Sequence, residues 1–473
     1  MHDNNNKIGA TEPVPRNALS KGLSSRQITM ISIGGVIGAG FFVGCASAIM
    51  AAGPAVLVSF GVAAALVVLV MGMLGELATT NPDSGSFSTY AQNALGRWAG
   101  FSIGWLYWWF YVLVIPLEAI VASDILGGWL GLPSMLIGVL LIAALIFTNI
   151  LSVKNFGTLE YWFSLIKVVT ILAFIVLGFT AIAGLLPGSS ARGLEHLWAD
   201  GGFAPTGLPG MASALVLALF SFTGMEIVTI AAAESEDPRR NIHKAIRSVV
   251  WRMLIFYFGS IFVIVSLVAW NSPALANGSF QSALEAMNVP GAATIVQAVI
   301  LVGVASTLNS AIFTASRMGY SLATRRDAPR SWARTTQQGV PRISVLFASA
   351  GALVLLVANY TLPQSVLVPL IATIGTIALV MYLVIAVSQV VLRKRAIARG
   401  EELRVKFPLF PALSYLTIAP IVAFLGLMAV VPGHQMELLV SSILTGGLIV
   451  VGGWLQYRDR SQAGSGAELR SSA

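Results

Sequence analysis

The sequence predicts an all-α, polytopic membrane protein with twelve transmembrane helices. Of its 473 residues, 56 % are hydrophobic and only 10 % are charged, whereas a soluble domain carries about 25 % charged residues. The mean hydropathy is +0.82. The apolar residues gather in twelve stretches of roughly 20 residues, which is the length that crosses a bilayer as a helix. Together these observations exclude a soluble fold.

The placement of lysine and arginine predicts the orientation. An even number of spans puts both termini on one side, and the loops and tails of that side carry 24 of the 28 basic residues. The opposite loops carry Arg192, and Lys167, Arg252 and Arg317 fall inside spans. Cytoplasmic loops are enriched in Lys and Arg, so both termini are expected in the cytoplasm. The net charge of +8 therefore reports topology, and no nucleic-acid partner is expected.

The expected spans follow one another with short connections. They are residues 28–51, 54–78, 97–125, 131–151, 160–186, 209–233, 246–270, 294–322, 343–358, 365–393, 409–431 and 437–456. Helices 1–10 (28–393) are expected to form the core and helices 11–12 (409–456) to lie outside it. Residues 1–27 and 457–473 are polar and are expected to be cytoplasmic tails.

Glycine crowds the middle of the first span. Residues 33–44 contain five glycines, and each costs about 1 kcal/mol against alanine in a helix interior. One explanation is close helix packing, with Gly34/Gly38 and Gly40/Gly44 as pairs of small residues four apart. The other is a helix broken in mid-membrane, with residues 38–40 unwound. Such a break would offer free amides to an anion and free carbonyls to a cation.

The sixth span repeats this feature. If spans 1–5 and 6–10 form two units, the second enters the membrane from the opposite face because five is odd. Residues 220–226 place small and polar side chains and Glu226 at membrane depth. Interruptions at matching positions of two halves indicate a transporter binding site. The pattern therefore predicts a five-plus-five inverted repeat with broken helices 1 and 6 around a small zwitterion.

Several motifs resemble the amino acid–polyamine–organocation (APC) superfamily in their order and spacing. They are residues 35–42, the run 220–226 continuing to Pro238 and Arg239, and residues 309–317. The resemblance covers about residues 20–456 and is closest to the bacterial amino acid transporter branch, and within it to 4-aminobutyrate (GABA) permeases. Residues 103–110, 114–119, 151–155 and 226–235 carry this closer match. It implies proton-coupled uptake or exchange of amino acids across the bacterial inner membrane, driven by the proton gradient without a cofactor.

The resemblance also implies binding positions for the substrate. The amides of Ala39, Gly40 and Phe41 are expected to meet a carboxylate, and the carbonyls of Val36, Phe220 and Thr223 an ammonium. Relatives carry a serine or threonine where this chain has Ala39, so here the carboxylate must rely more on the backbone. The Phe220 ring is expected to stack over the substrate. Asn309 either donates a hydrogen bond to the substrate or only bonds across helices.

Ionisable residues inside spans are functional candidates by default. Glu118 pairs with the substrate ammonium, pairs with Lys167, or is a protonated acid. Lys167 either extends to the interface or is a buried amine, whose charged form burial disfavours, and which carries the coupling proton. Glu226 is either a second proton-carrying gate residue or a polar plug beside the break. Glu234, with Pro238 and Arg239, is either solvated or part of a cytoplasmic gate with Arg97 or Arg317.

The sequence carries no signature of an enzyme or a metal protein. The single cysteine, Cys45, allows no intramolecular disulfide. The four histidines lack metal-ligand spacing, and no nucleophile triad or phosphate-binding loop is present. We therefore expect a secondary transporter whose partners are an amino acid, protons and the lipid bilayer. A permease or exchanger for proline or aromatic amino acids, and an amino-acid sensor, remain alternatives.

Overall fold

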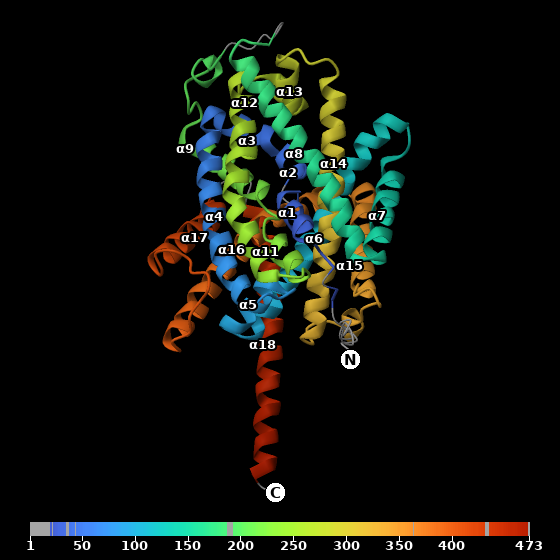
Figure 1. The fold of residues 1–473 in the computed structure, drawn as a ribbon, viewed down its shortest axis with the longest axis vertical. Helices are drawn as coiled ribbons and strands as arrows, with labels where there is room; N and C mark the ends of the chain where they lie inside the picture. The colour runs from blue at the N-terminus through green and yellow to red at the C-terminus, as the bar shows by residue number, and fades with distance from the viewer. Residues whose placement is uncertain are drawn as a thin grey trace, which may run out of the picture.

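The structure is a computed structural model that describes residues 19–20, 22–34, 37–42, 44–186, 193–362, 364–430 and 435–471. Over these residues the chain is helical, apart from loops and one isolated bridge between Leu23 and Ser235. The helices form an elongated bundle, and the end of α18 extends from it as a single helix (Figure 1). The predicted all-α class is confirmed.

Among the described residues, nine helical segments are long and apolar enough to cross a membrane. Two shorter apolar helices, Gly207–Ser221 and Leu254–Leu267, lie between them in the chain. This set is consistent with twelve spans, because several spans are built from more than one helix. The long unbroken helices are α4 (Val56–Thr80), α6 (Arg97–Leu130), α7 (Ser134–Leu151), α8 (Val153–Ile182), α14 (Ala292–Thr324), α15 (Arg342–Thr361), α16 (Gln364–Ala398), α17 (Ala412–Val430) and α18 (Gln435–Ser471).

The first span is broken, as predicted. It consists of α1 (Ser25–Gly34), α2 (Ala39–Phe42) and α3 (Gly44–Ala52), with Ile37 and Gly38 outside any helix. The break lies before the predicted position, because Ala39 and Gly40 belong to α2. The Phe41 and Phe42 amides both donate to the Gly38 carbonyl, at 3.1 and 3.4 Å, and these bonds start the new helix at Ala39.

The sixth span is broken as well. Helix α9 (Gly207–Ser221) ends before residues 222–226, and α10 (Ile227–Ala233) follows. Gly224 has a φ of 100°, a backbone conformation that side-chain-bearing residues rarely adopt. The Ser221 hydroxyl donates to the Gly40 carbonyl at 3.2 Å, so the two interrupted helices are joined directly.

Several helix boundaries differ from the predicted ones. Helix α8 begins at Val153 rather than near residue 160, and α18 continues through Ser471 into the expected tail. The seventh span begins with α11 (Pro238–Arg252) and passes through a π-helical turn, Met253–Phe258, into α12 (Gly259–Leu267). The short helices α5 (Ser86–Leu95) and α13 (Ser279–Ala286) connect spans. Helices can continue past the lipid, so hydropathy alone does not locate their ends.

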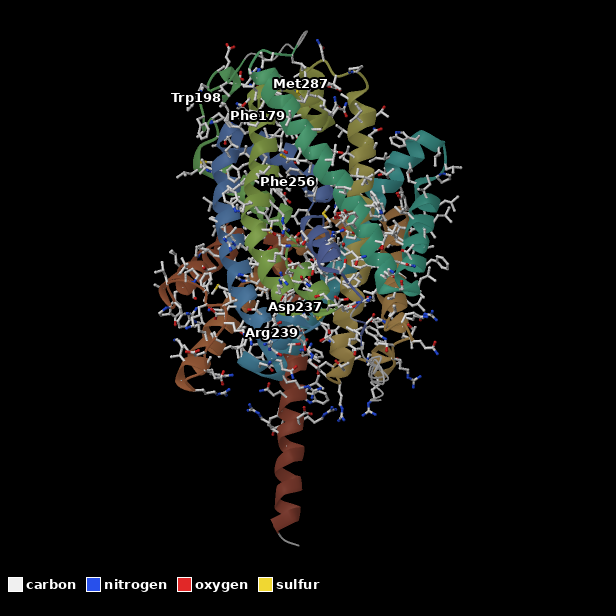
Figure 2. All side chains as sticks on the ribbon, in the orientation of Figure 1. Phe179, Trp198, Asp237, Arg239, Phe256 and Met287 are labelled. Carbon is white, nitrogen blue, oxygen red and sulfur yellow. The ribbon has the colours of Figure 1, made fainter. Side chains whose placement is uncertain are left out.

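The two ends of the bundle differ. We call the end that holds α5 and the protruding part of α18 the basic end (Figure 1). Asp237 and Arg239 lie toward it, and Trp198 and Met287 lie at the opposite end (Figure 2).

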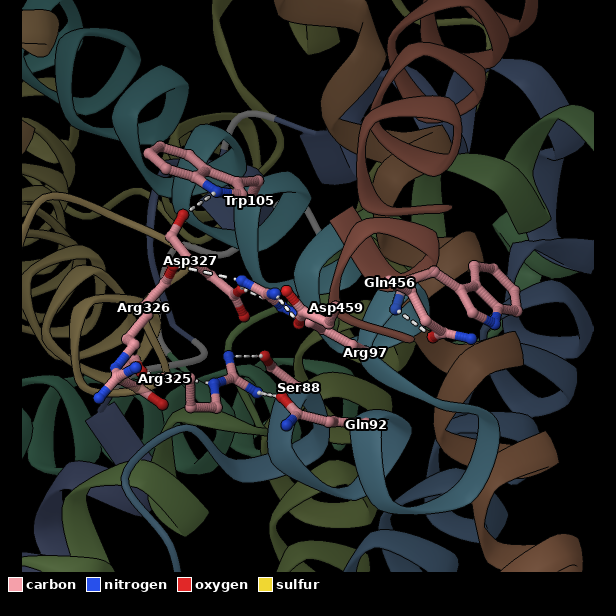
Figure 3. Close-up of polar contacts among 11 residues, drawn as sticks. Ser88, Gln92, Arg97, Trp105, Arg325, Arg326, Asp327, Gln456 and Asp459 are labelled. Carbon is pink, nitrogen blue, oxygen red and sulfur yellow. Dashed lines mark hydrogen bonds and ion pairs between the residues drawn. The ribbon is translucent and has the colours of Figure 1, made fainter. Parts of the chain in front are cut away.

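A polar cluster joins three helices at the basic end (Figure 3). Arg97, at the start of α6, donates from Nε to Oδ1 of Asp327 at 2.9 Å and also pairs with Asp459 of α18. Arg325 donates to Ser88 of α5 at 2.6 Å. The cluster thereby fixes α6, the turn after α14, α5 and α18 to one another.

Candidate functional site

A cavity of about 40 Å³ lies where the two helix breaks meet. Water occupies roughly 10–15 Å³ on this measure, so the cavity holds only a few waters. A larger zwitterion requires it to widen. Its wall is formed by the two broken spans together with the continuous helices α6 and α14. The lining residues are Gly38, Gly40, Phe110, Tyr111, Val114, Leu117, Glu118, Phe220, Ser221, Thr223, Gly224 and Thr307.

Glycine is required where the first break approaches its neighbours. A Cβ on Gly40 would lie 3.1 Å from Cε1 of the Phe220 ring, and a Cβ on Gly38 would lie 3.0 Å from a carboxylate oxygen of Glu118. Both atoms belong to the cavity wall. The first-span glycines thus allow backbone to face the cavity, which the packing explanation alone does not require.

Four of the eight residues predicted to bind substrate line this cavity, namely Gly40, Glu118, Phe220 and Thr223. Ala39 is the first residue of α2. The amide of Phe41 is bonded to Gly38, as described above, and its ring packs on Tyr257 with centroids 4.4 Å apart, so the expected free amide at Phe41 is wrong. Val36 lies outside the described residues.

The carbonyl of Phe220 is already occupied. It accepts from the Thr223 amide at 3.1 Å and from the Thr223 hydroxyl at 2.8 Å. An ammonium would have to compete with both bonds. Glu118, on α6, is the acidic group in the cavity wall and is 4 % exposed.

Lys167 does not extend to the interface. Its side chain is fully buried, and its Nζ donates to the carbonyls of Gly34 and Ile37 and to the Ser306 hydroxyl. The last two contacts measure 3.0 and 2.8 Å. The ammonium therefore lies against the break in the first span and ties it to α14.

Glu160 is a buried acid that sequence reasoning did not single out. The Ser306 hydroxyl donates to its Oε1, and Asn309 donates to its Oε2 at 3.3 Å. Asn309 accepts in turn from Asn149 at 2.9 Å, so it bonds across helices in this conformation while its neighbour Thr307 lines the cavity. Its spacing from Lys167 could have identified Glu160 in the sequence, because residues seven apart share one face of a helix.

Glu226 is bonded on both of its oxygens. Oε1 accepts from the hydroxyls of Tyr107 and Tyr111 at 3.1 and 3.2 Å, and Oε2 accepts from the Gly224 amide at 3.1 Å. The acid thus joins the second break to α6. Since Tyr111 lines the cavity, Glu226 also fixes part of the cavity wall.

Glu234 is a buried partner of Arg317 and not part of a solvated cluster. Arg317 donates from Nε to Oε1 at 2.7 Å and from Nη2 to Oε2 at 3.3 Å, and both side chains are 1 % exposed. The Leu23 amide donates to the Glu234 carbonyl at 3.2 Å. The segment that precedes α1 is therefore held against α10 and α14, between the cavity and the basic end. Arg97 belongs to the separate cluster of Figure 3.

Over the part of the chain that the structure describes, no group of three or more His, Cys, Asp or Glu side chains has the arrangement of a metal site. Lys167 and Glu226, beside the two breaks, instead bind backbone carbonyls, hydroxyls and a backbone amide. The cavity itself combines one acid, hydroxyls and aromatic rings, and a few well-placed polar groups in a mostly apolar lining can orient a small polar molecule.

Comparison with known proteins gives one consistent result. Residues 27–462 match the amino acid permease family. The chain is 50 % identical to the gamma-aminobutyric acid permease of Escherichia coli, over 91 % of this chain and 93 % of the relative. It is 46 % identical to the gamma-aminobutyric acid permease of Bacillus subtilis, over 94 % and 95 %. A crystal structure of an Eremococcus coleocola manganese transporter variant has a similar fold, with a TM-score of 0.57, 14 % identity and coverage of 96 % and 97 %.

Proposed function

The chain belongs to the amino acid permease family, and from that premise we propose that it takes up 4-aminobutyrate, or a close zwitterion, together with a proton. The family and the relatives above are permeases, not enzymes. The observation that carries the proposal is the meeting of both broken helices at one cavity. The two relatives named as gamma-aminobutyric acid permeases favour this substrate over proline or aromatic amino acids.

The carboxylate of the substrate binds the amides that follow the first break. Ala39 and Gly40 are the first residues of α2, and the first amides of a helix have no partner within it. Gly40 has no side chain to shield its amide, and Phe220 covers it from the opposite wall. These uncharged donors suit a carboxylate in a dry site because they are held in place before it arrives.

The ammonium of the substrate pairs with Glu118. Its carboxylate lines the cavity, whereas the Phe220 carbonyl is engaged by Thr223. Glu118 is also the acid among the residues that line this cavity, so it is the lining group that carries the charge an ammonium needs. Binding thus uses one charged wall for the ammonium and backbone amides for the carboxylate.

The coupling proton resides on Lys167. Its ammonium bonds to the carbonyl of Gly34, the last residue of α1, and to that of Ile37 within the first break, so loss of the proton weakens contacts that hold α1 in place. Protonation and the shape of the cavity are coupled in this way. The basic end faces the cytoplasm of a bacterial cell, with both termini on that side, as the Lys and Arg distribution predicts.

The test is uptake of labelled 4-aminobutyrate into proteoliposomes, with and without an inward proton gradient. We expect accumulation only with the gradient, and competition by unlabelled 4-aminobutyrate. Unlabelled proline, phenylalanine and tryptophan should compete weakly. Failure of 4-aminobutyrate to compete would overturn the substrate, and equal accumulation without the gradient would overturn the coupling.

A further inference from the structure

Glu160 offers a second proton position next to Lys167. We infer that Glu160 takes the coupling proton from Lys167 through the Ser306 hydroxyl and releases it toward the basic end. The inference rests on the proposed function, because it presupposes that Lys167 carries the proton. Lys167 is fully buried, so its proton needs neighbouring groups that can pass it on toward water.

The three contacts of Lys167 are not equivalent. The carbonyls of Gly34 and Ile37 accept a hydrogen bond but have no proton of their own to pass on. Ser306 accepts from Lys167 at 2.8 Å and at the same time donates to Oε1 of Glu160. Only this hydroxyl can pass a proton from one neighbour to the next, since a hydroxyl is both donor and acceptor.

The transfer balances without any other reactant. An N–H bond of the ammonium breaks and its proton moves to the Ser306 oxygen, while the proton of Ser306 moves to the Glu160 carboxylate. The products are a neutral amine, an intact serine and a carboxylic acid. Both Lys167 and Glu160 are fully buried, and in such surroundings an ion pair loses much of its advantage over the neutral pair.

The charged groups facing Lys167 are arranged on two sides. Glu118 of α6 acts on it electrostatically from the cavity, and Glu160 acts from its own helix, α8. Within the described residues around this group, α1 contributes the Gly34 carbonyl and α14 the uncharged Ser306 and Asn309. The lysine therefore has one acid on the substrate side and another on the far side.

Glu160 lies closer to the basic end than Lys167 does. Seven residues separate them in α8, which is about 10 Å along the helix axis. One turn further, α1 and the segment before it cover this position, because a Cβ on Gly157 would lie 2.6 Å from Leu23, and Gln27 donates to Thr158 at 3.3 Å. Movement of α1 away from α8 would bring Glu160 into contact with water from the basic end.

The experiment compares two transport modes in proteoliposomes for Glu160→Gln and Ser306→Ala. Counterflow of labelled 4-aminobutyrate at equal pH needs no net proton movement, whereas accumulation under an inward proton gradient does. We expect both variants to keep counterflow close to wild type. Gradient-driven accumulation should fall about tenfold or more, the scale that a lost proton-transfer group produces.

Two further variants separate proton transfer from a structural effect. Glu160→Asp keeps a carboxyl group and should recover part of the accumulation. Thr314→Ala, the matched control, removes another α14 hydroxyl, which donates to the Ser310 carbonyl of its own helix, and should leave both modes unchanged. A structural role would instead lower counterflow and accumulation in parallel. If Glu160→Gln does not reach the membrane, the comparison of counterflow and accumulation in Ser306→Ala distinguishes proton transfer from a structural role.

Lys167→Ala distinguishes this inference from the proposed function. Normal gradient-driven accumulation in Lys167→Ala would overturn the proton role of Lys167 itself. Loss in Lys167→Ala with normal accumulation in Ser306→Ala or Glu160→Gln would overturn only the transfer to Glu160. Parallel loss of both transport modes in the two variants would also overturn it.

Discussion

Gly38 lies so close to Thr307 that a Cβ at position 38 would be 2.3 Å from the threonine hydroxyl oxygen. The backbone of the first break is thus in contact with α14 across the cavity. Since both residues line the cavity, the space for a substrate depends on the absence of a side chain at Gly38.

Gly38→Ala is expected to weaken 4-aminobutyrate binding about tenfold or more, because overpacking a tight site costs about 1–3 kcal/mol. Gly44→Ala is the matched control, since the nearest atom to its new Cβ would be 3.8 Å away. Competition binding on purified protein measures both. Adding Thr307→Ala to Gly38→Ala should restore part of the affinity, and equal weakening by Gly44→Ala would contradict the explanation.

The second prediction concerns the buried pair Glu234 and Arg317. Glu234→Gln leaves an uncompensated guanidinium inside the protein, which typically costs about 3–5 kcal/mol. We expect a large drop in melting temperature and loss of transport. Exchanging the charges in the double variant Glu234→Arg, Arg317→Glu should recover part of the stability. If Glu234→Gln were as stable as wild type, the pair would not be what holds α10 against α14.

The third prediction tests whether Glu226 is a plug or a proton carrier. Glu226→Gln keeps one oxygen for the two tyrosines but loses the acceptor for the Gly224 amide, a loss of about 1–3 kcal/mol. We expect reduced transport with an unchanged pH profile. Tyr107→Phe and Tyr111→Phe should each have a smaller effect of the same kind. A flattened pH profile in Glu226→Gln would instead assign the residue a proton.

The fourth prediction separates the two acids bound to Arg97 (Figure 3). The Asp327 side chain has no exposed surface, whereas that of Asp459 is 48 % exposed. Asp327→Asn should therefore lower the melting temperature clearly, because it breaks a buried pair. Asp459→Asn should cost about 0–1 kcal/mol, the usual range for an exposed pair. Equal shifts for both variants would contradict this difference.

The same cluster predicts a pH effect. Burial raises the pKa of Asp327, and the hydrogen bond from Arg97 opposes that rise. In Arg97→Gln the opposing bond is lost, so the pKa of Asp327 rises further above its unfolded value. The resulting penalty acts on the charged form and is relieved as falling pH protonates the acid. The melting-temperature difference between variant and wild type should shrink toward low pH; a constant or growing difference would refute this role of Arg97.

The sequence was sufficient to predict both helix breaks and to single out Lys167, which the structure places against the first break. Glycines and polar residues destabilise a membrane helix, so their presence at matching depths of two spans indicates that both helices are interrupted there. Ser306 and Glu160 were missed because their meeting depends on how α14 packs on α8, which one sequence does not reveal. The free amide expected at Phe41 was wrong because Gly38 accepts from it, a detail of where the new helix begins.

The most direct test of the central claim is an experimental density map of the protein with bound 4-aminobutyrate. The account predicts the carboxylate at the amides of Ala39 and Gly40 and the ammonium beside Glu118, with Phe220 over the ligand. A map in which residues 37–38 and 222–226 form continuous helix, or in which the ligand lies away from both breaks, would contradict it.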